Sequence, residues 1–262
     1  MKKILLSAFC AIGLIGAAQE NKTWRIGVQW GAQGNCATYD GGMSEANARF
    51  NQNKFGSGAL DLIGRYDLNQ RWMIMSGLGF HSIGFDFGIA ENYSLLNKDR
   101  KYSSVKSQFA AAEIPVMAFY KFNPNCKNAR WLVGAGFAET FVSGQTLNKS
   151  VSQAGDGPSN VNYMSSTATS NGGVYWMLRW SVAREKMYKN GSLLNASLMC
   201  NVGFATIAHA TVNYTIDNQD YTHSFSNNGS FAGFRLTYFF KPLKSLSSPS
   251  GNRKPGTAAS IN

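Results

Sequence analysis

Charged residues recur among apolar ones along the chain and are the first candidates for chemistry. Facing one another in a confined space, they could form an ion path through a narrow gated pore or a packed ion-pair network. A carboxylate removed from water needs a cationic partner. We therefore expect Glu113 and Asp61 each to lie within hydrogen-bond reach of an arginine, in a network that is structural. The full set is Arg25, Asp61, Arg65, Glu113, Lys121, Arg179 and Arg235.

The histidines and cysteines are the other candidates for chemistry. His81, His209 and His223, with neighbouring Ser and acidic residues, could serve a lipid hydrolase or acyltransferase. The chain lacks both the Gly-x-Ser-x-Gly and the His-Glu-x-x-His motif, so solvated loop histidines are the simpler interpretation. Behind a predicted leader the cysteines are odd in number, and their spacing matches no metal motif. We predict no enzyme, no catalytic residue, no cofactor and no metal. The three cysteines are Cys36, Cys126 and Cys200.

Strands are the elements that would position these side chains. In eight segments apolar residues occupy alternate positions, which is the pattern of a strand with one apolar face. Polar or small residues fill the other positions, as where Leu60 and Leu62 flank Asp61. The segments are residues 24–31, 60–68, 72–80, 113–122, 131–137, 174–182, 194–202 and 233–240.

The connections between the segments alternate in length. Long polar ones cover 34–56, 86–107, 143–172 and 205–229, whereas 69–71, 123–129 and 185–191 are short. Strict alternation places every long connection at one end of an antiparallel array, as in bacterial outer-membrane barrels with short periplasmic turns. The sequence therefore predicts an all-β fold: an eight-stranded antiparallel transmembrane up-and-down barrel with long extracellular loops and both termini in the periplasm.

Composition indicates which face of the strands meets lipid. The 262 residues are 44% hydrophobic and only 15% charged, whereas soluble domains average about 25% charged. After the first 18 residues no stretch reaches the ~20 apolar residues of a spanning helix. A soluble barrel would show the same period with its faces exchanged. The polar face, however, is rich in Gly, Ser and Met and poor in Lys and Glu, so we expect the apolar face to point outward.

Aromatic residues gather at one level of this predicted barrel. Alternating up and down strand directions place them all at the periplasmic end. Amphipathic rings prefer the depth of the lipid headgroups, so the set predicts an aromatic girdle. Its members are Trp24, Tyr66, Trp72, Tyr120, Phe122, Trp131, Tyr238 and Phe240.

The two ends of the chain differ from the middle in composition. Residues 1–18 have a basic start, an apolar run and small residues at the end, which predicts a signal peptide. Residues 19–240 would form the barrel, and 241–262, rich in Ser, Pro and Gly, a disordered basic periplasmic tail. The leader holds two positive charges of the net +11 and the tail four, which leaves +5. We therefore expect no nucleic-acid partner; the tail could instead contact an acidic one.

One predicted strand carries a family resemblance. FAAAEIPVMAFYKF, with Glu113, Ile114 and Pro115 at its centre, resembles the "LEIPLLLKY" strand of the PorT-like outer-membrane barrel family. The resemblance covers roughly residues 22 to 240, although the tail beyond Phe240 departs from the family pattern. It implies an eight-stranded barrel, and a few relatives serve secretion or gliding machinery. The final strand, SFAGFRLTYFF, resembles the signal that the barrel-assembly machinery recognises.

These observations lead to a ranked set of functions. The first is a structural or partner-binding role, as an accessory of an envelope or secretion complex. The alternatives are a narrow gated pore for small solutes and a lipid-modifying enzyme. Expected partners are outer-membrane lipid, the barrel-assembly machinery, and an envelope protein bound through the outer loops or the tail. Tyrosines in those loops suit either partner binding or packing within the loops: Tyr39, Tyr93, Tyr102, Tyr163, Tyr214 and Tyr221.

Overall fold

A computed structural model describes residues 23–39, 50–53, 55–90, 102–123, 129–154, 161–216 and 219–242. The predicted signal peptide (1–18), all but the first two residues of the predicted tail, Tyr93 and Cys126 lie outside these ranges. Within the described ranges, no helix has the length and apolar character needed to span a membrane.

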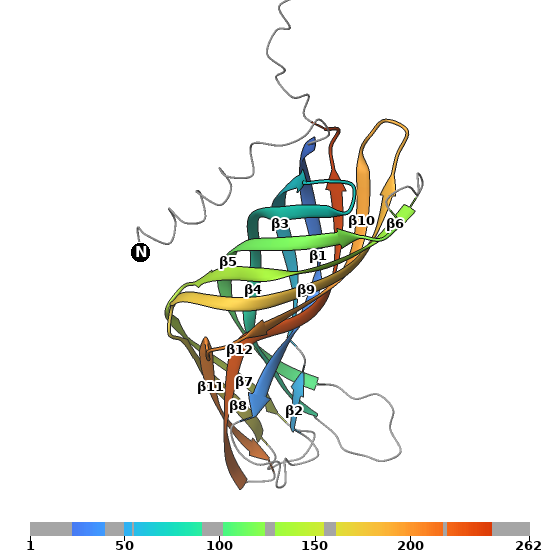
Figure 1. Ribbon diagram of the computed structural model, residues 1–262. Helices are drawn as coiled ribbons and strands as arrows, with labels where there is room; N and C mark the ends of the chain where they lie inside the picture. Colours follow the sequence, from blue (N-terminus) through green and yellow to red (C-terminus); the bar gives the residue numbers. More distant parts are fainter. Residues whose placement is uncertain are drawn as a thin grey trace, which may run out of the picture.

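Eight antiparallel strands close into a barrel, which confirms the predicted fold (Figure 1). Each strand corresponds to one of the eight alternating segments, although segments 60–68, 113–122 and 233–240 each extend one residue past the end of the strand. The circle closes where the last strand pairs with the first, with Gly27 opposite Phe239. In order around the barrel they are β1 (Thr23–Tyr39), β3 (Phe55–Asp67), β4 (Trp72–Ala90), β5 (Tyr102–Lys121), β6 (Ala129–Val142), β9 (Gly173–Met187), β10 (Leu193–Gly203) and β12 (Gln219–Phe239).

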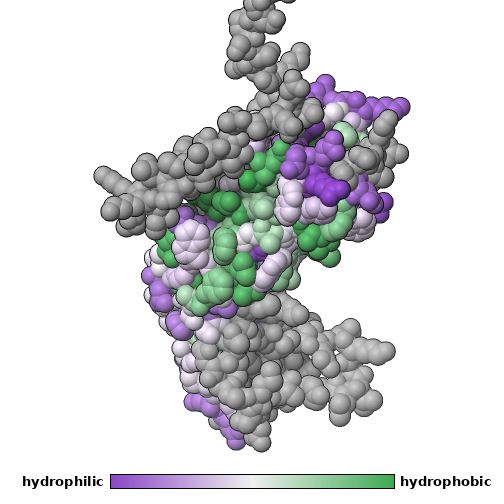
Figure 2. Space-filling view, in the orientation of Figure 1, coloured by the Kyte–Doolittle hydropathy of each residue, from purple (hydrophilic) through white to green (hydrophobic). Residues whose placement is uncertain are grey.

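The apolar face of the strands points outward and the polar face fills the lumen. Leu60 and Leu62 are 58% and 57% exposed, whereas Asp61 between them is 3% exposed. A register slip of one residue would turn every side chain to the opposite face. The exposed leucines and the buried aspartate therefore show that the predicted assignment of faces is correct. The space-filling view shows the resulting apolar surface on the barrel wall (Figure 2).

Beyond one end of the barrel the same sheet continues through additional strands. β7 (Gln145–Ala154), β8 (Val161–Ser170) and β11 (Ala208–Ile216) pair in the order β7-β8-β11 with residues 219–227 of β12. We call these four segments the extension sheet. The short β2 (Phe50–Asn53) pairs with the end of β4 at the same end of the molecule (Figure 1). The prediction that 143–172 and 205–229 are loops is therefore wrong, although both do connect barrel strands at one end.

The extension sheet has an apolar core of its own. Its inner face packs against the ends of β4 and β5, where Phe87 and Phe225 are in contact with ring centroids 4.7 Å apart. Thr and Val, which are frequent in these segments, favour strands. The inward positions carry apolar residues such as Ala168 and Val212. Tyr214 is buried in this core, whereas Tyr163 is exposed. The loop tyrosines thus divide between packing and exposure.

The opposite end of the barrel, which we call the short-turn end, carries tight hairpins. In the turn between β3 and β4 the Asn69 side chain accepts hydrogen bonds from the backbone amides of Arg71 and Trp72, both at 2.8 Å. Asn favours such turns for this reason. In the hairpin between β9 and β10, Gly191 has a φ of 85°, which glycine adopts without strain.

Candidate functional site

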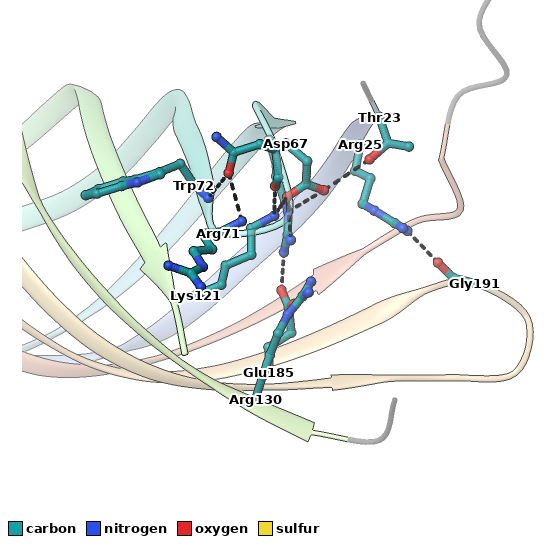
Figure 3. Close-up of polar contacts among 11 residues, drawn as sticks. Thr23, Arg25, Asp67, Arg71, Trp72, Lys121, Arg130, Glu185 and Gly191 are labelled. Carbon is teal, nitrogen blue, oxygen red and sulfur yellow. Dashed lines mark hydrogen bonds and ion pairs between the residues drawn. The ribbon is translucent and has the colours of Figure 1, made fainter. Parts of the chain in front are cut away.

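The lumen at the short-turn end holds a dense ion-pair cluster (Figure 3). The Asp67 carboxylate lies 2.8 Å from an Arg65 guanidinium nitrogen and 2.7 Å from Lys121 Nζ. Glu185 accepts hydrogen bonds from Arg65 and, at 2.6 Å, from Arg130 Nε. Two carboxylates from different strands thus each bind two cations, and Arg65 joins them.

Two residues near the start of β1 complete this cluster. Arg25 donates a hydrogen bond to the carbonyl oxygen of Gly191, and Thr23 donates one to Asp67 at 3.1 Å. The cluster joins β1, β3, β5, β6 and β9, and fixes the β9–β10 hairpin to the first strand. Its cations, Arg25, Arg65, Lys121 and Arg130, outnumber its two carboxylates, so this end of the lumen is positively charged.

A layer of apolar side chains lies next to this cluster inside the barrel. Glycines opposite them on the neighbouring strands leave space for the aromatic rings of this layer. A Cβ on Gly134 would lie 2.4 Å from the Phe119 ring, and one on Gly27 would lie 2.7 Å from the Phe239 ring. An adjoining cavity holds only about 20 Å³, which is room for about one water molecule. The layer consists of Ile63, Met73, Met75, Met117, Phe119, Leu132, Ala183, Leu193 and Phe239.

A second charged cluster occupies the middle of the barrel. An Arg179 terminal nitrogen lies 2.5 Å from Glu113, and Arg179 Nε donates to Asn201 at 2.6 Å. His81 Nδ1 is 3.8 Å from the same Glu113 oxygen. Glu113 therefore has the arginine partner that we expected.

Asp61 does not have such a partner. Its carboxylate is 3.9 Å from Arg235 Nε, beyond hydrogen-bond reach, and Arg235 donates instead to Gln33. Asp61 Oδ1 has no hydrogen-bond partner among the described residues. Gly79 makes room for both carboxylates, since a Cβ there would lie 2.4 Å from Asp61 Oδ1 and 3.0 Å from Glu113 Cγ.

His81 is the clearest correction to the histidine interpretation. The sequence placed it at the end of a strand among solvated histidines, but it lies within β4, faces the lumen and is 6% exposed. Neither of its ring nitrogens has a hydrogen-bond partner among the described residues. His209 is exposed on β11, and His223 Nε2 lies 2.9 Å from the Tyr214 hydroxyl in the extension sheet. The three histidines thus do not share a site.

Sequence reasoning missed three charged members of the short-turn cluster: Asp67, Arg130 and Glu185. The alternation of side chains along a strand could have identified two of them, because residues an even number of positions apart share a face. Asp67 follows Arg65 by two residues, and Glu185 is in step with Arg179 along β9. The sequence pattern predicts that Glu185 begins the short connection 185–191, whereas β9 continues to Met187.

The aromatic residues of the predicted girdle lie on the outer wall near the short-turn end. Several meet in pairs across or along strands: the ring centroids of Trp24 and Tyr66 are 4.6 Å apart, and those of Trp72 and Tyr120 are 5.2 Å apart. Tyr120 and Phe122 are 5.0 Å apart, and Tyr238 and Phe240 5.4 Å. Trp131 lies beneath the Arg184 guanidinium at 5.6 Å.

No metal site is evident in the part of the chain that the structure describes, where no three His, Cys, Asp or Glu side chains are grouped to hold an ion. Cys200 is a free, exposed thiol on the outer wall.

Comparisons with known proteins give the wider context. OprG from Pseudomonas aeruginosa is 10% identical, with 87% of this chain and 99% of OprG covered at a TM-score of 0.41. A major outer membrane protein from Thermus thermophilus is 14% identical, with 83% and 98% covered at 0.39. Ail, the attachment invasion locus protein of Yersinia pestis, is 10% identical, with 83% and 99% covered at 0.30. A search of curated proteins finds no significant match.

The family comparison is more informative than these structural similarities. A family model described as "Outer membrane protein beta-barrel domain" matches residues 17–203. That span is more than half of the chain and covers the strands from β1 to β10. The protein therefore belongs to the outer membrane protein beta-barrel domain family.

Proposed function

We propose that this protein is a closed outer-membrane barrel that presents its extension sheet to a partner outside the cell. Both termini would then be periplasmic, and the short-turn end would face the periplasm. The observation that carries the proposal is the exposed face of the extension sheet, which is polar and carries little charge.

The strand register of the extension sheet aligns its outward side chains in rows. Hydroxyl and amide groups dominate, and each of them can both donate and accept hydrogen bonds. Most of the residues carry no charge, and all are at least partly exposed. One row is Thr146, Thr169, His209 and Ser226; the next is Asn148, Thr167, Thr211 and Ser224; the third is Ser150, Ser165, Asn213 and Thr222.

The filled lumen supports binding rather than conduction. A solute would have to displace the ion pairs around Arg65, the apolar layer with Phe119 and Phe239, and then the pair of Glu113 and Arg179. Each charged group displaced from its partner would remain in a confined interior at high cost. We therefore expect no steady current through the protein in planar bilayers.

The proposal includes membership of the PorT-like family. The Glu113-Ile114-Pro115 segment supports a PorT-like barrel, and such a barrel would suit an accessory of an envelope or secretion complex. The aromatic last strand supports recognition by the barrel-assembly machinery. No arrangement of histidine, serine and carboxylate among the described residues favours a lipid-modifying enzyme.

Site-specific labelling of intact cells tests the proposed orientation. Thr167→Cys places a thiol at the centre of the extension sheet, and Lys189→Cys places one on the β9–β10 hairpin, both in a background without native cysteines. A membrane-impermeant maleimide should label the first on intact cells and the second only after the envelope is opened. Labelling in the reverse pattern would overturn the proposal.

The binding role needs a second measurement. A photo-crosslinking amino acid at position 167 should give a discrete adduct with an external protein or glycan. The same amino acid at Leu198, which is 66% exposed on the barrel wall, should capture lipid alone. Captured species that are identical at the two positions would count against a partner-binding face.

A further inference from the structure

The outer wall carries a groove near the short-turn end that the proposed function does not use. It holds about 360 Å³ and is lined by Ala129, Arg184, Lys186, Leu194 and Ala196. The register explains its shape. Lys186 of β9 pairs with Ala129 of β6 and Leu194 of β10, and Arg184 pairs with Ala196 of β10. The two small alanines leave open space beside two long cationic side chains.

The cations in this groove have no carboxylate partner among the described residues. Arg184 and Lys186 are both exposed, and neither takes part in an ion pair within the described part of the chain. Glu185, the residue between them, points into the lumen and binds Arg65 and Arg130 instead. Alternation along β9 thus separates two outward positive charges from the neighbouring negative charge.

Aromatic contacts support the two cationic side chains. The Arg184 guanidinium lies 5.6 Å from the centre of the Trp131 ring, and Lys186 Nζ lies 5.7 Å from that of Tyr188. Such contacts stabilise a cation over a ring face. The N–H groups of Arg184 and Lys186 that do not point at a ring stay available to a hydrogen-bond acceptor. The groove therefore offers one planar and one compact cation beside an apolar floor.

The position of the groove matches the depth of lipid headgroups. Trp131 pairs with Arg184, and Tyr238 with Leu194, so the groove lies at the level of the aromatic residues. Farther along the wall the outward residues are apolar: Val133, Val182 and Leu198. Hydrophilic residues also gather near the short-turn end in Figure 2. Cations on the lipid face cost little near the interface and much more at the midplane.

We propose that this groove binds the anionic headgroup of a membrane glycerophospholipid. The lipid phosphate accepts hydrogen bonds from the Arg184 fork, a geometry that suits phosphate oxygens, and Lys186 supplies a second charge. The acyl chains lie along the apolar wall beyond Ala196. A volume of about 360 Å³ falls within the range of ~300 to 1,000 Å³ of small-molecule sites. The inference concerns the wall of the barrel and is independent of the extension sheet.

Native mass spectrometry of the purified full-length protein can test this site. The protein would be released from mixed micelles containing equal amounts of phosphatidylglycerol and phosphatidylcholine. We expect the wild type to retain phosphatidylglycerol, and an Arg184→Gln/Lys186→Gln variant to retain it on the order of tenfold to thirtyfold less, because each cation near a lipid surface adds to the attraction. Lys189→Gln/Lys241→Gln removes two exposed cations outside the groove and should retain lipid as the wild type does.

A second variant separates the groove from its charge. Ala196→Trp fills the space without altering any charge and should also reduce retention about tenfold. Equal retention of the two lipids by the wild type would overturn the proposal. Undiminished retention by the double glutamine variant or by Ala196→Trp would overturn it as well. The heat-dependent gel mobility typical of folded barrels establishes that each variant has closed.

Discussion

Glu113→Gln tests how strongly the central cluster stabilises the barrel. The side chains of Glu113 and Arg179 are each 1% exposed and lie 2.5 Å apart. The substitution keeps the size of the side chain but removes its charge, and so leaves a buried arginine without its counter-ion. Breaking one partner of a buried pair costs roughly 3 to 5 kcal/mol. With a urea dependence of about 2 kcal/mol/M, the lower value corresponds to a fall in the unfolding midpoint of about 1.5 M.

Tryptophan fluorescence during urea titration in lipid vesicles measures this midpoint. Glu139→Gln is the matched control, because Glu139 points outward from the barrel wall and is only partly buried. This substitution should shift the midpoint by less than about 0.25 M. Adding Arg179→Met to Glu113→Gln removes the unpaired cation and should recover more than half of the loss. A shift below about 0.3 M for Glu113→Gln alone would refute the reasoning that this pair is buried and coupled.

Three further outcomes follow from the geometry. Gly134→Ala should lower the unfolding midpoint by the equivalent of about 1 to 3 kcal/mol, because its Cβ would overlap a lumenal ring, whereas Gly34→Ala, with no atom within 4 Å of its Cβ, should not lower it. In a chain without other cysteines, Cys200 on the lipid-facing wall should react with an apolar maleimide in vesicles and resist a charged one. Burial lowers the pKa of His223, so the unfolded chain binds more protons there. Protection factors near its contact with Tyr214, which correct the exchange rate for the intrinsic rate at each pH, should therefore fall as pH falls below about 6.5, but not in His223→Gln.

The assignment of faces could be predicted because lipid and lumen demand opposite side chains. The alternation of Leu60, Asp61 and Leu62 leaves one possible register relative to the wall. The pairing of charges inside could not be predicted in the same way. Asp61 pairs with Gln29, and Gln29 pairs with Thr237, so Arg235 lies farther along its strand. The offset between Asp61 and Arg235 depends on how far neighbouring strands are staggered in the barrel. The sequence of a single strand does not determine that stagger.

The extension sheet escaped prediction for a different reason. Its strands present Ser, Thr and Asn on one face and small residues such as Ala168 and Ala210 on the other. This contrast is too weak to separate strand from polar loop. The apolar partners that bury the inner face, among them Phe87, come from distant strands. The candidate site on the outer wall was likewise hidden, because a groove arises only when Ala129 and Ala196 flank the cations of β9.

The make-up of the extension sheet links its completion to insertion. It joins two separate hairpins, β7–β8 and β11–β12, along the contact between β8 and β11, and Asn171 N donates to Ile207 O at 3.1 Å beside that seam. The β9–β10 hairpin lies between them in sequence, and the closed barrel, in which β6, β9, β10 and β12 are neighbours in that order, holds the two hairpins side by side. An unassembled chain in transit would display two loose hairpins and no continuous face. A partner that recognises the whole face would therefore engage finished molecules and ignore precursors, without any dedicated checkpoint.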